Sequence, residues 1–254
     1  MLHRRLYQFF IIYFLGLTAL LLVKYAFNLS DYVIPGVPEI WQTFRHTYAR
    51  FLGAVIDTLS VAILGHGLSI GLATVVAIIG RLPIWVGSFI RVAAYNIQAY
   101  PIVAVAPIIF ILLGDGLSTR LLIAAMICYF PLLLSFIGVF SEPVSEIEHF
   151  FEATRRMNWR LQIKIRAFEN IQKLITVVVG SGTMAMVGTI VAEFIAADAG
   201  IGYSIRIALY QSDLSKILVA LFLIGICTSL YLVGLEWSGY LIQKRWAISR
   251  GGVK

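Results

Sequence analysis

The sequence predicts an all-α membrane protein that crosses the bilayer about six times. Hydrophobic residues make up 60% of the 254 residues and charged residues only 13%, whereas soluble domains average about 25% charged residues. The mean hydropathy is +0.89. The apolar residues also form runs of membrane-spanning length. Composition and grouping together exclude an ordinary soluble globule.

Six apolar segments are long enough to span a membrane, which takes roughly 20 residues for about 30 Å of hydrocarbon. They are approximately 8–26, 55–79, 85–112, 119–140, 172–197 and 215–241. The first follows Arg4 and Arg5 as a secretory signal would, but it is long and no small-x-small cleavage site follows, so we retain it as a span. The third contains Pro101 and Pro107, and is either one bent helix or two half-helices.

The distribution of basic residues predicts that both termini face the cytoplasm, because cytoplasmic segments of membrane proteins are enriched in Lys and Arg. The outside segments then hold Lys24, Arg45, Arg50, Arg120, Arg206 and Lys216, and Arg91 lies within the third span. The inside segments hold most of the 20 Lys and Arg residues, namely Arg4, Arg5, Arg81, Arg155, Arg156, Arg160, Lys164, Arg166, Lys173, Lys244, Arg245, Arg250 and Lys254.

We divide the chain into an N-terminal span with an external linker (1–54), a transmembrane core (55–241) and a cytoplasmic tail (242–254). The inside segment at about 141–171 is the only stretch with the composition of a soluble protein. Its apolar residues recur at near-helical spacing, which predicts two amphipathic helices. They lie either on anionic lipid or against a cytoplasmic partner. The second alternative explains four carboxylates that lipid anchoring does not need, namely Glu146, Glu148, Glu152 and Glu169.

Ionisable residues inside the apolar spans are further candidates for function, because a charge costs about 2.5–3.5 kcal/mol at the bilayer centre. We expect Asp57 to sit at a helix start, where it complements the helix dipole. His66 either faces a translocation path or is a buried, hydrogen-bonded histidine. Arg91 either contacts an anion or reaches the inside interface. Glu193 lies deep enough to need a partner, and Glu236 is expected to pair with a cation or reach the interface.

Small residues along the second and fifth spans suit close helix crossing, and equally suit sliding between two packings. They are Gly65, Gly67, Gly71, Gly180, Gly182 and Gly188. Cys128 and Cys227 lie inside apolar segments and are interpreted as small buried hydrophobes, with no disulfide framework implied.

The chain shows no motif for chemistry of its own. No Gly-x-x-x-x-Gly-Lys-Ser/Thr sequence occurs, so ATP is expected to bind elsewhere. No nucleophile motif such as Gly-x-Ser-x-Gly is present. The histidines lack the ligand spacing of a zinc site; they are His3, His46, His66 and His149. We therefore expect no catalytic residue, no metal and no cofactor on this chain.

Several motifs resemble the membrane subunits of binding-protein-dependent ABC importers, particularly the nitrate/sulfonate/taurine/bicarbonate branch. Residues 151–158 (FEATRRMN) resemble the EAA loop, a short coupling helix that sits in a groove of the ATPase subunit. The PIVAVAP sequence at 101–107 with GDGLS at 114–118, Phe130-Pro131 before Gly138, and Ala192-Glu193 with GIGY at 200–203 also resemble this branch. The likeness covers roughly residues 55–241 in matching order.

The resemblance implies a type I ABC importer-like permease fold in a bacterial inner membrane. The implied partners are two ATPase subunits that bind ATP and Mg, a second permease subunit (identical or different) and an extracytoplasmic solute-binding protein. The solute would be small and polar or anionic, such as a sulfonate, nitrate or bicarbonate. His66, Arg91, Pro101 and Pro107 become candidates for the path or gate, Glu193, Gly200 and Gly202 for a structural role, and Glu152, Ala153, Thr154, Arg155, Arg156, Met157, Asn158 and Trp159 for the ATPase-coupling loop.

The loop departs from the family pattern at three places. Asn158 stands where the family has Gly, Phe168-Glu169 where it has Leu-Pro, and Lys173 near a further proline. We expect Asn158 to allow the turn through left-handed backbone, whereas the missing prolines leave open how the chain re-enters the fifth span. Two other functions stay open: a stand-alone secondary transporter or channel, and a non-transporting scaffold that recruits a cytoplasmic protein.

Overall fold

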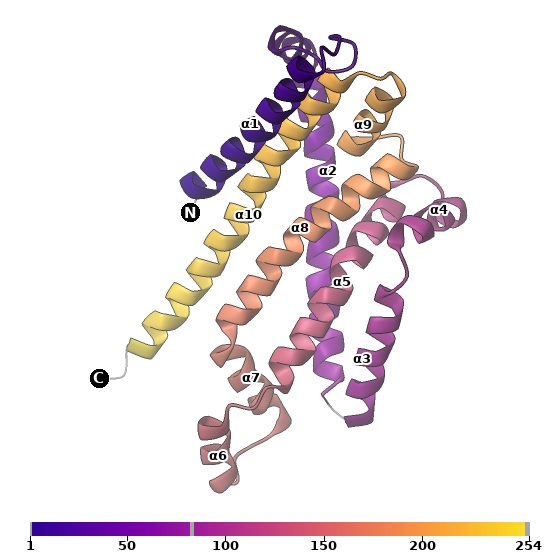
Figure 1. Cartoon of the computed structure of the whole chain (residues 1–254). Coiled ribbons are helices and arrows are strands. Elements are labelled where there is room, and N and C mark those ends of the chain that lie inside the picture. The colour runs from indigo at the N-terminus through magenta and orange to yellow at the C-terminus, as the bar shows by residue number, and fades with distance from the viewer. Residues whose placement is uncertain (1, 82–83, 252–254) are drawn as a thin grey trace.

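A computed structural model describes residues 2–81 and 84–251, and these residues contain helices and no strand. Figure 1 shows the long helices side by side with the two short helices α6 and α7 at one end of the bundle, here called the loop end. The helices are α1 (Leu2–Ala26), α2 (Val37–Ile79), α3 (Ile84–Gln98), α4 (Ile102–Leu113), α5 (Leu117–Ser141), α6 (Ser145–Ala153), α7 (Trp159–Glu169), α8 (Ile171–Ile195), α9 (Gly200–Tyr210) and α10 (Leu214–Gly251).

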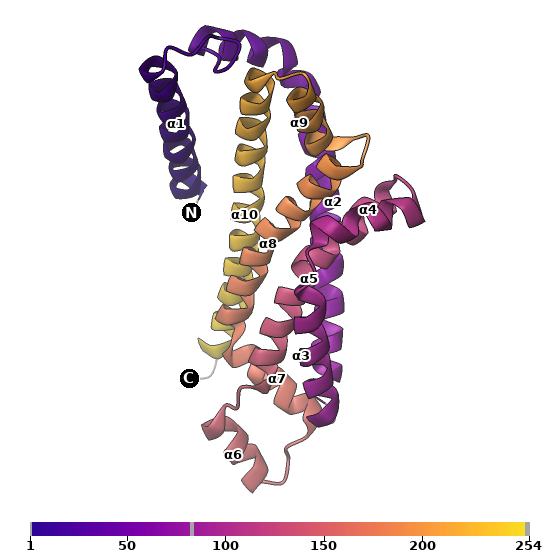
Figure 2. The ribbon, with the colours of Figure 1, turned by 45° about the vertical axis from the view of Figure 1, so that its right-hand side comes forward.

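The prediction of about six spans is confirmed. Five helices (α1, α2, α5, α8 and α10) are long and apolar enough to cross a membrane, and α3 with α4 makes a sixth if the pair is one span. That pair is bent by 90° at the break between residues 98 and 102. Pro101 is the N-cap of α4 and Pro107 lies inside it. The third segment is therefore two helices, and α4 points away from the bundle (Figure 2).

Helix α2 is longer than the predicted second span. It comprises 43 residues from Val37 to Ile79, and Figure 2 shows its first part running across the end of the bundle opposite the loop end before the helix turns down. Pro38 lies in the first turn of this helix. Proline suits that position because it lacks an N–H group, and N–H groups in the first turn have no acceptor within the helix. The expected boundary at 54 falls inside this helix. Asp57 is consequently far from the helix start, and its predicted role there is wrong.

The core lies where α2, α5 and α8 pack against one another, and α10 covers α2 and α8. Glycine allows the close approach: a Cβ on Gly65 would lie 3.1 Å from Ala124 Cβ, and one on Gly188 3.0 Å from Ile127 Cδ1. Gly182 likewise faces α10, at 2.8 Å from Leu235 Cδ1. The packing prediction is wrong for three other glycines, which have no neighbour within 4 Å at that position: Gly67, Gly71 and Gly180.

Helix α1 stands apart from the core in Figure 2 and packs mainly against α10. The ring of Phe9 covers Gly225, where a Cβ would lie 2.1 Å from Phe9 Cε2. Glu236 forms an ion pair with Arg5, so its expected cation partner is present. The α1–α2 connection lies at the end opposite the loop end, so both chain termini point back toward the loop end (Figure 1).

Candidate functional site

The loop end carries the predicted coupling segment on an exposed turn between α6 and α7. Both predicted amphipathic helices are present, as Ser145–Ala153 and Trp159–Glu169. Figure 1 shows α6 projecting beyond the ends of the long helices. From Glu152 to Trp159 every side chain is exposed except that of Met157, which is half-buried. The segment therefore presents charged and aromatic groups to whatever lies beyond the bundle.

A buried ion pair fixes α6 to α7. Arg166 Nε lies 2.5 Å from Glu148 Oε1 and Arg166 Nη2 lies 2.7 Å from Glu148 Oε2. Arg166 Nη1 also donates to the carbonyl oxygen of Phe140 at 2.8 Å, which ties the pair to the end of α5. Gln162 donates to Glu148 and accepts from Arg81. Bidentate Arg–carboxylate pairs are directional, so the exposed turn rests on a rigid base.

Arg166 also keeps the Glu148 carboxyl group ionised. Hydrogen bonds from Arg166 hold the pKa of Glu148 at about 2, well below its ordinary value of 4.5. The backbone N–H of Val144 donates to the same carboxylate at 3.2 Å. Glu148 is therefore an anion at every physiological pH, and the α6–α7 unit keeps its ion pair.

The turn between α6 and α7 does not use Asn158 in the way the sequence predicted. Asn158 has extended backbone (φ −139°, ψ 162°), and its side chain accepts a hydrogen bond from Leu161 N at 2.9 Å as the N-cap of α7. The left-handed residue is Arg155, with φ 52°. Asparagine thus starts the second helix, and the sharp change of direction occurs three residues earlier.

The chain re-enters the bundle through Asn170 and not through a proline. Asn170 alone separates α7 from α8, and its side chain donates to the carbonyl oxygen of Arg166 at 3.0 Å. Lys173, near the place of the further family proline, pairs with Glu142 at 2.5 Å. The change from α7 to α8 therefore occurs at Asn170 without a proline.

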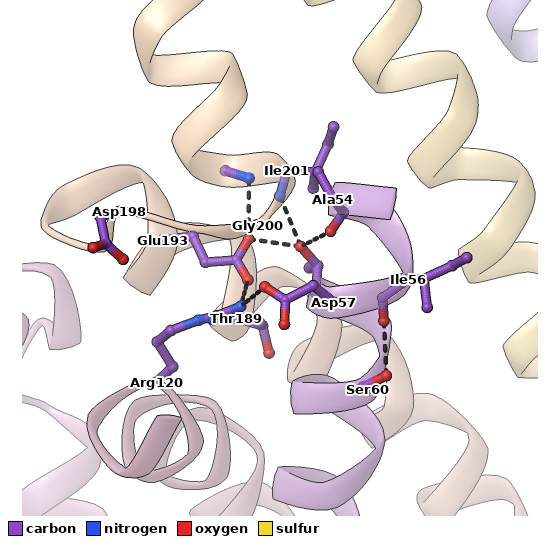
Figure 3. A network of polar contacts seen from close by, with 12 residues as sticks. Ala54, Ile56, Asp57, Ser60, Arg120, Thr189, Glu193, Asp198, Gly200 and Ile201 are labelled. Carbon is purple, nitrogen blue, oxygen red and sulfur yellow. Dashed lines mark hydrogen bonds and ion pairs between the residues drawn. The ribbon is translucent and has the colours of Figure 1, made fainter. Parts of the chain in front are cut away.

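A second polar cluster is buried at the opposite end of the bundle, between α2, α5, α8 and α9 (Figure 3). Glu193 is fully buried, and its carboxylate receives hydrogen bonds from Arg120 Nη2 at 2.5 Å, Thr58 Oγ1 at 2.7 Å and Gly202 N at 3.0 Å. Arg120 also donates to Asp57 at 2.7 Å. These three donors satisfy acceptor positions on both oxygens of the Glu193 carboxyl group.

The start of α9 is shaped to fit this carboxylate. Gly200 has φ 91°, a conformation that favours glycine, and a Cβ there would lie 2.1 Å from Glu193 Cδ. A Cβ on Gly202 would lie 2.4 Å from the carbonyl oxygen of Ile190. Ile201 N donates to Thr58 Oγ1 at 2.8 Å. The GIGY sequence therefore lets two backbone amides reach the buried cluster.

The sequence indicated Glu193, Gly200 and Gly202 but missed Arg120 and Thr58. Arg120 was counted only as an outside cation, yet it is 6% exposed and joins three helices. The sequence did contain a signal for Arg120: an arginine at the start of one apolar span and a glutamate near the end of another are expected to pair, because a buried charge without a partner is costly. Thr58 carried no such signal, because a threonine within a helix usually bonds to its own backbone.

The path and gate candidates lie in different places. His66 is buried, with Tyr231 Oη 2.6 Å from Nδ1 and Ser181 Oγ 2.8 Å from Nε2, so it joins α2, α8 and α10 inside one chain. This geometry matches the buried-histidine alternative. Arg91 is exposed and lines a cavity near the loop end. Pro101 lines a separate cavity of about 450 Å³ at the α3–α4 bend, whereas Pro107 lies inside α4.

Among residues 2–81 and 84–251, no group of three or more His, Cys, Asp or Glu side chains is placed to hold a metal ion. Cys128 and Cys227 are both free thiols. The arrangement offers two rigid polar clusters, one at each end of an apolar bundle, and an exposed turn on one of them.

Comparison with known proteins identifies the family of this chain. The family described as "Binding-protein-dependent transport system inner membrane component" matches residues 69–248. The chain belongs to this family. It is therefore a permease subunit of a binding-protein-dependent transporter, an integral membrane protein that crosses the bilayer several times. The matched region includes α5 to α9 entirely, and so both polar clusters except the part on α2 before residue 69.

Two individual proteins are also similar to this chain. The "Riboflavin transport system permease protein RibX" of Chloroflexus aurantiacus is 31% identical over 131 residues, which are 52% of this chain and 49% of that protein. The match thus spans about half the length of this relative. The "Formylaminopyrimidine transport permease protein ThiX" of Halalkalibacterium halodurans is 20% identical over 202 residues, 78% of this chain and 79% of the relative. Neither name refers to nitrate, sulfonate, taurine or bicarbonate.

Proposed function

We propose that this permease subunit imports a planar nitrogen heterocycle related to vitamins, driven by separate ATPase subunits that dock on the loop end. The observation that carries the coupling part is the exposed turn at Glu152–Trp159 on a base fixed by the Glu148–Arg166 pair. A rigid base allows a push on the turn to reach α5, since Arg166 also bonds Phe140. In this proposal two copies, or this chain and a related subunit, enclose the path, and a solute-binding protein delivers the solute.

The names of the two relatives, for riboflavin and formylaminopyrimidine, support the substrate class. The cavity at the α3–α4 bend suits a flat ring, because Tyr100 and Phe130 lie in its apolar lining and Gln98 offers an amide. Its volume of about 450 Å³ is in the range of small-molecule sites. This replaces the sulfonate, nitrate or bicarbonate suggested by the sequence motifs.

Uptake into proteoliposomes that contain the chain with its ATPase and binding protein tests the substrate class. We expect ATP-dependent uptake of riboflavin or formylaminopyrimidine and none of taurine. Transport by the chain alone under an ion gradient, without ATP, would instead indicate a stand-alone carrier. Absence of any flux with all partners present would favour the scaffold function.

Charge reversal tests the coupling turn. Glu152→Arg combined with Ala153→Trp should abolish co-purification with the ATPase and lower the transport-linked ATP hydrolysis at least tenfold, because both side chains are exposed where α6 ends and the turn begins. Glu146→Arg makes the same charge change on α6 outside the turn and serves as the control. If association and hydrolysis persist in the double variant, the turn is not the coupling element.

A further inference from the structure

A basic cavity lies at the loop end between the end of α2, the start of α3 and the end of α5. Its volume is about 310 Å³. Among the described residues, its lining contains two arginines and two serines but no carboxylate: Gly80, Arg81, Gly87, Ser88, Arg91, Val92, Ile137 and Ser141. Two cations and two hydroxyls without an acid favour an anion as the occupant.

One of the arginines lacks a partner for a buried donor. Arg81 Nη2 donates to Gln162 at 2.8 Å, but Arg81 Nε is buried and has no hydrogen-bond partner among the described residues. Buried donors of this kind are uncommon, and a bound ion or water is one ordinary reason for them. Arg91 is exposed, and no ion pair within residues 2–81 and 84–251 joins it to a carboxylate.

The acid that interacts with Arg81 does not hydrogen-bond to it. Glu148 is close enough to Arg81 to interact electrostatically, but both of its oxygens are occupied by Arg166, and Gln162 and Val144 donate to them as well. The backbone around the cavity is tightly packed, since a Cβ on Gly87 would lie 2.4 Å from the carbonyl oxygen of Gly80. Among the described residues, Arg81 is held by Gln162, and no ion pair joins Arg81 or Arg91 to a carboxylate.

The surroundings favour a lipid source for the anion. Trp85 and Phe89, on the same helix as Arg91, are 73% and 69% exposed. Tryptophan is enriched at the membrane–water interface, and basic pockets between spans on the cytoplasmic side bind lipid headgroups. We propose that this cavity binds the phosphate group of an anionic phospholipid, with Arg81 and Arg91 on the phosphate oxygens and the acyl chains along Trp85 and Phe89.

Native mass spectrometry of the purified full-length chain tests the proposal with phosphatidylglycerol, phosphatidylcholine and inorganic phosphate as separate probes. We expect phosphatidylglycerol to remain bound at concentrations where phosphatidylcholine does not. Arg91→Gln should weaken that binding at least tenfold, and Ser88→Asp should do the same by repulsion while both arginines remain. Arg245→Gln removes an exposed cation near the C-terminal end of α10, away from the cavity lining, and should leave binding unchanged.

Equal binding of phosphatidylglycerol to the wild type, Arg91→Gln and Ser88→Asp would overturn the site. Displacement of the lipid by millimolar inorganic phosphate, with phosphate bound in its place, would overturn the lipid source. A matching loss in both variants with wild-type thermal stability supports the site, because a folding defect would also change the melting temperature.

Discussion

Glu193 is the centre of the buried polar cluster at the end of the bundle opposite the loop end. Its carboxylate is fully buried and faces Arg120, Thr58 and the amide of Gly202. A buried pair adds little net stability compared with apolar residues of the same shape, but removing one partner leaves an uncompensated charge. The cluster therefore acts as a constraint that fixes α2, α5, α8 and α9 in one arrangement.

Neutralising Glu193 should accordingly be costly. We expect Glu193→Gln to lower the free energy of unfolding by about 3–5 kcal/mol, because Arg120 keeps its charge in a buried site where the half-exposed Asp57 is its remaining counter-ion. Asp57→Asn should cost about 1 kcal/mol or less, since the Asp57 side chain is 43% exposed and water replaces it. Reversible unfolding in mixed detergent measures both. Equal losses in the two variants would contradict a dominant role for the buried carboxylate.

Gly200 tests the same cluster through its backbone. Gly200→Ala should destabilise the protein by about 2–4 kcal/mol, because it combines an unfavourable φ of 91° with a Cβ 2.1 Å from Glu193 Cδ. Gly138→Ala is the matched control, since its Cβ would meet nothing within 4 Å and alanine suits a helix interior better than glycine. A Gly200→Ala chain as stable as the wild type would show that α9 can move away from Glu193.

At the scale of the element, α6 and α7 form one unit whose stability depends on pH. The folded pKa of Glu148 is about 2 against an ordinary 4.5. A lowered pKa contributes stability above pH 4.5, here about 3 kcal/mol, and this contribution is lost as the pH falls toward 2. Arg166 and Gln162 on α7 both donate hydrogen bonds to the Glu148 carboxylate on α6. Protonation of Glu148 should therefore release α6 from α7.

Spin labels on His149→Cys and Lys164→Cys, both exposed positions, measure this release in a chain whose two native cysteines are alanine. We expect a narrow distance distribution from pH 7 to 5 that broadens between about pH 4.5 and 2. Glu148→Gln should give the broad distribution at every pH. A wild-type distribution that stays narrow at pH 2.5 would refute the dependence on Glu148.

At the scale of the whole molecule, the start of α1 and the end of α10 are directed toward the end of the bundle that carries the α6–α7 unit. The excess of Lys and Arg at this end predicts that it is cytoplasmic. An impermeant maleimide should therefore label Tyr32→Cys, which is 77% exposed at the other end, in intact cells. It should label Lys164→Cys only after permeabilisation. Labelling of Lys164→Cys from outside would reverse the topology and remove the proposed ATPase contact.

The sequence by itself determined the features that depend on local composition: apolar runs that must be helices in a membrane, a charged amphipathic insert and the motifs that resemble a permease family. These follow because the bilayer requires each span to satisfy its own backbone hydrogen bonds. Arg4, Arg250 and Lys254 contributed to the predicted orientation, but their side chains lie outside the described residues.

Only the tertiary structure decided the pairings between distant segments. Arg120 with Glu193, Glu148 with Arg166, and His66 with Ser181 and Tyr231 join residues from separate helices. No periodicity encodes such partners, because the facing of two helices depends on how side chains interdigitate along their whole length. The continuous start of α2 was missed for the same reason, because packing selects among the helical arrangements that the residues allow. Pro101 and Pro107 did indicate a bend or break in the third segment, and the tertiary structure decided that it is two helices at 90°.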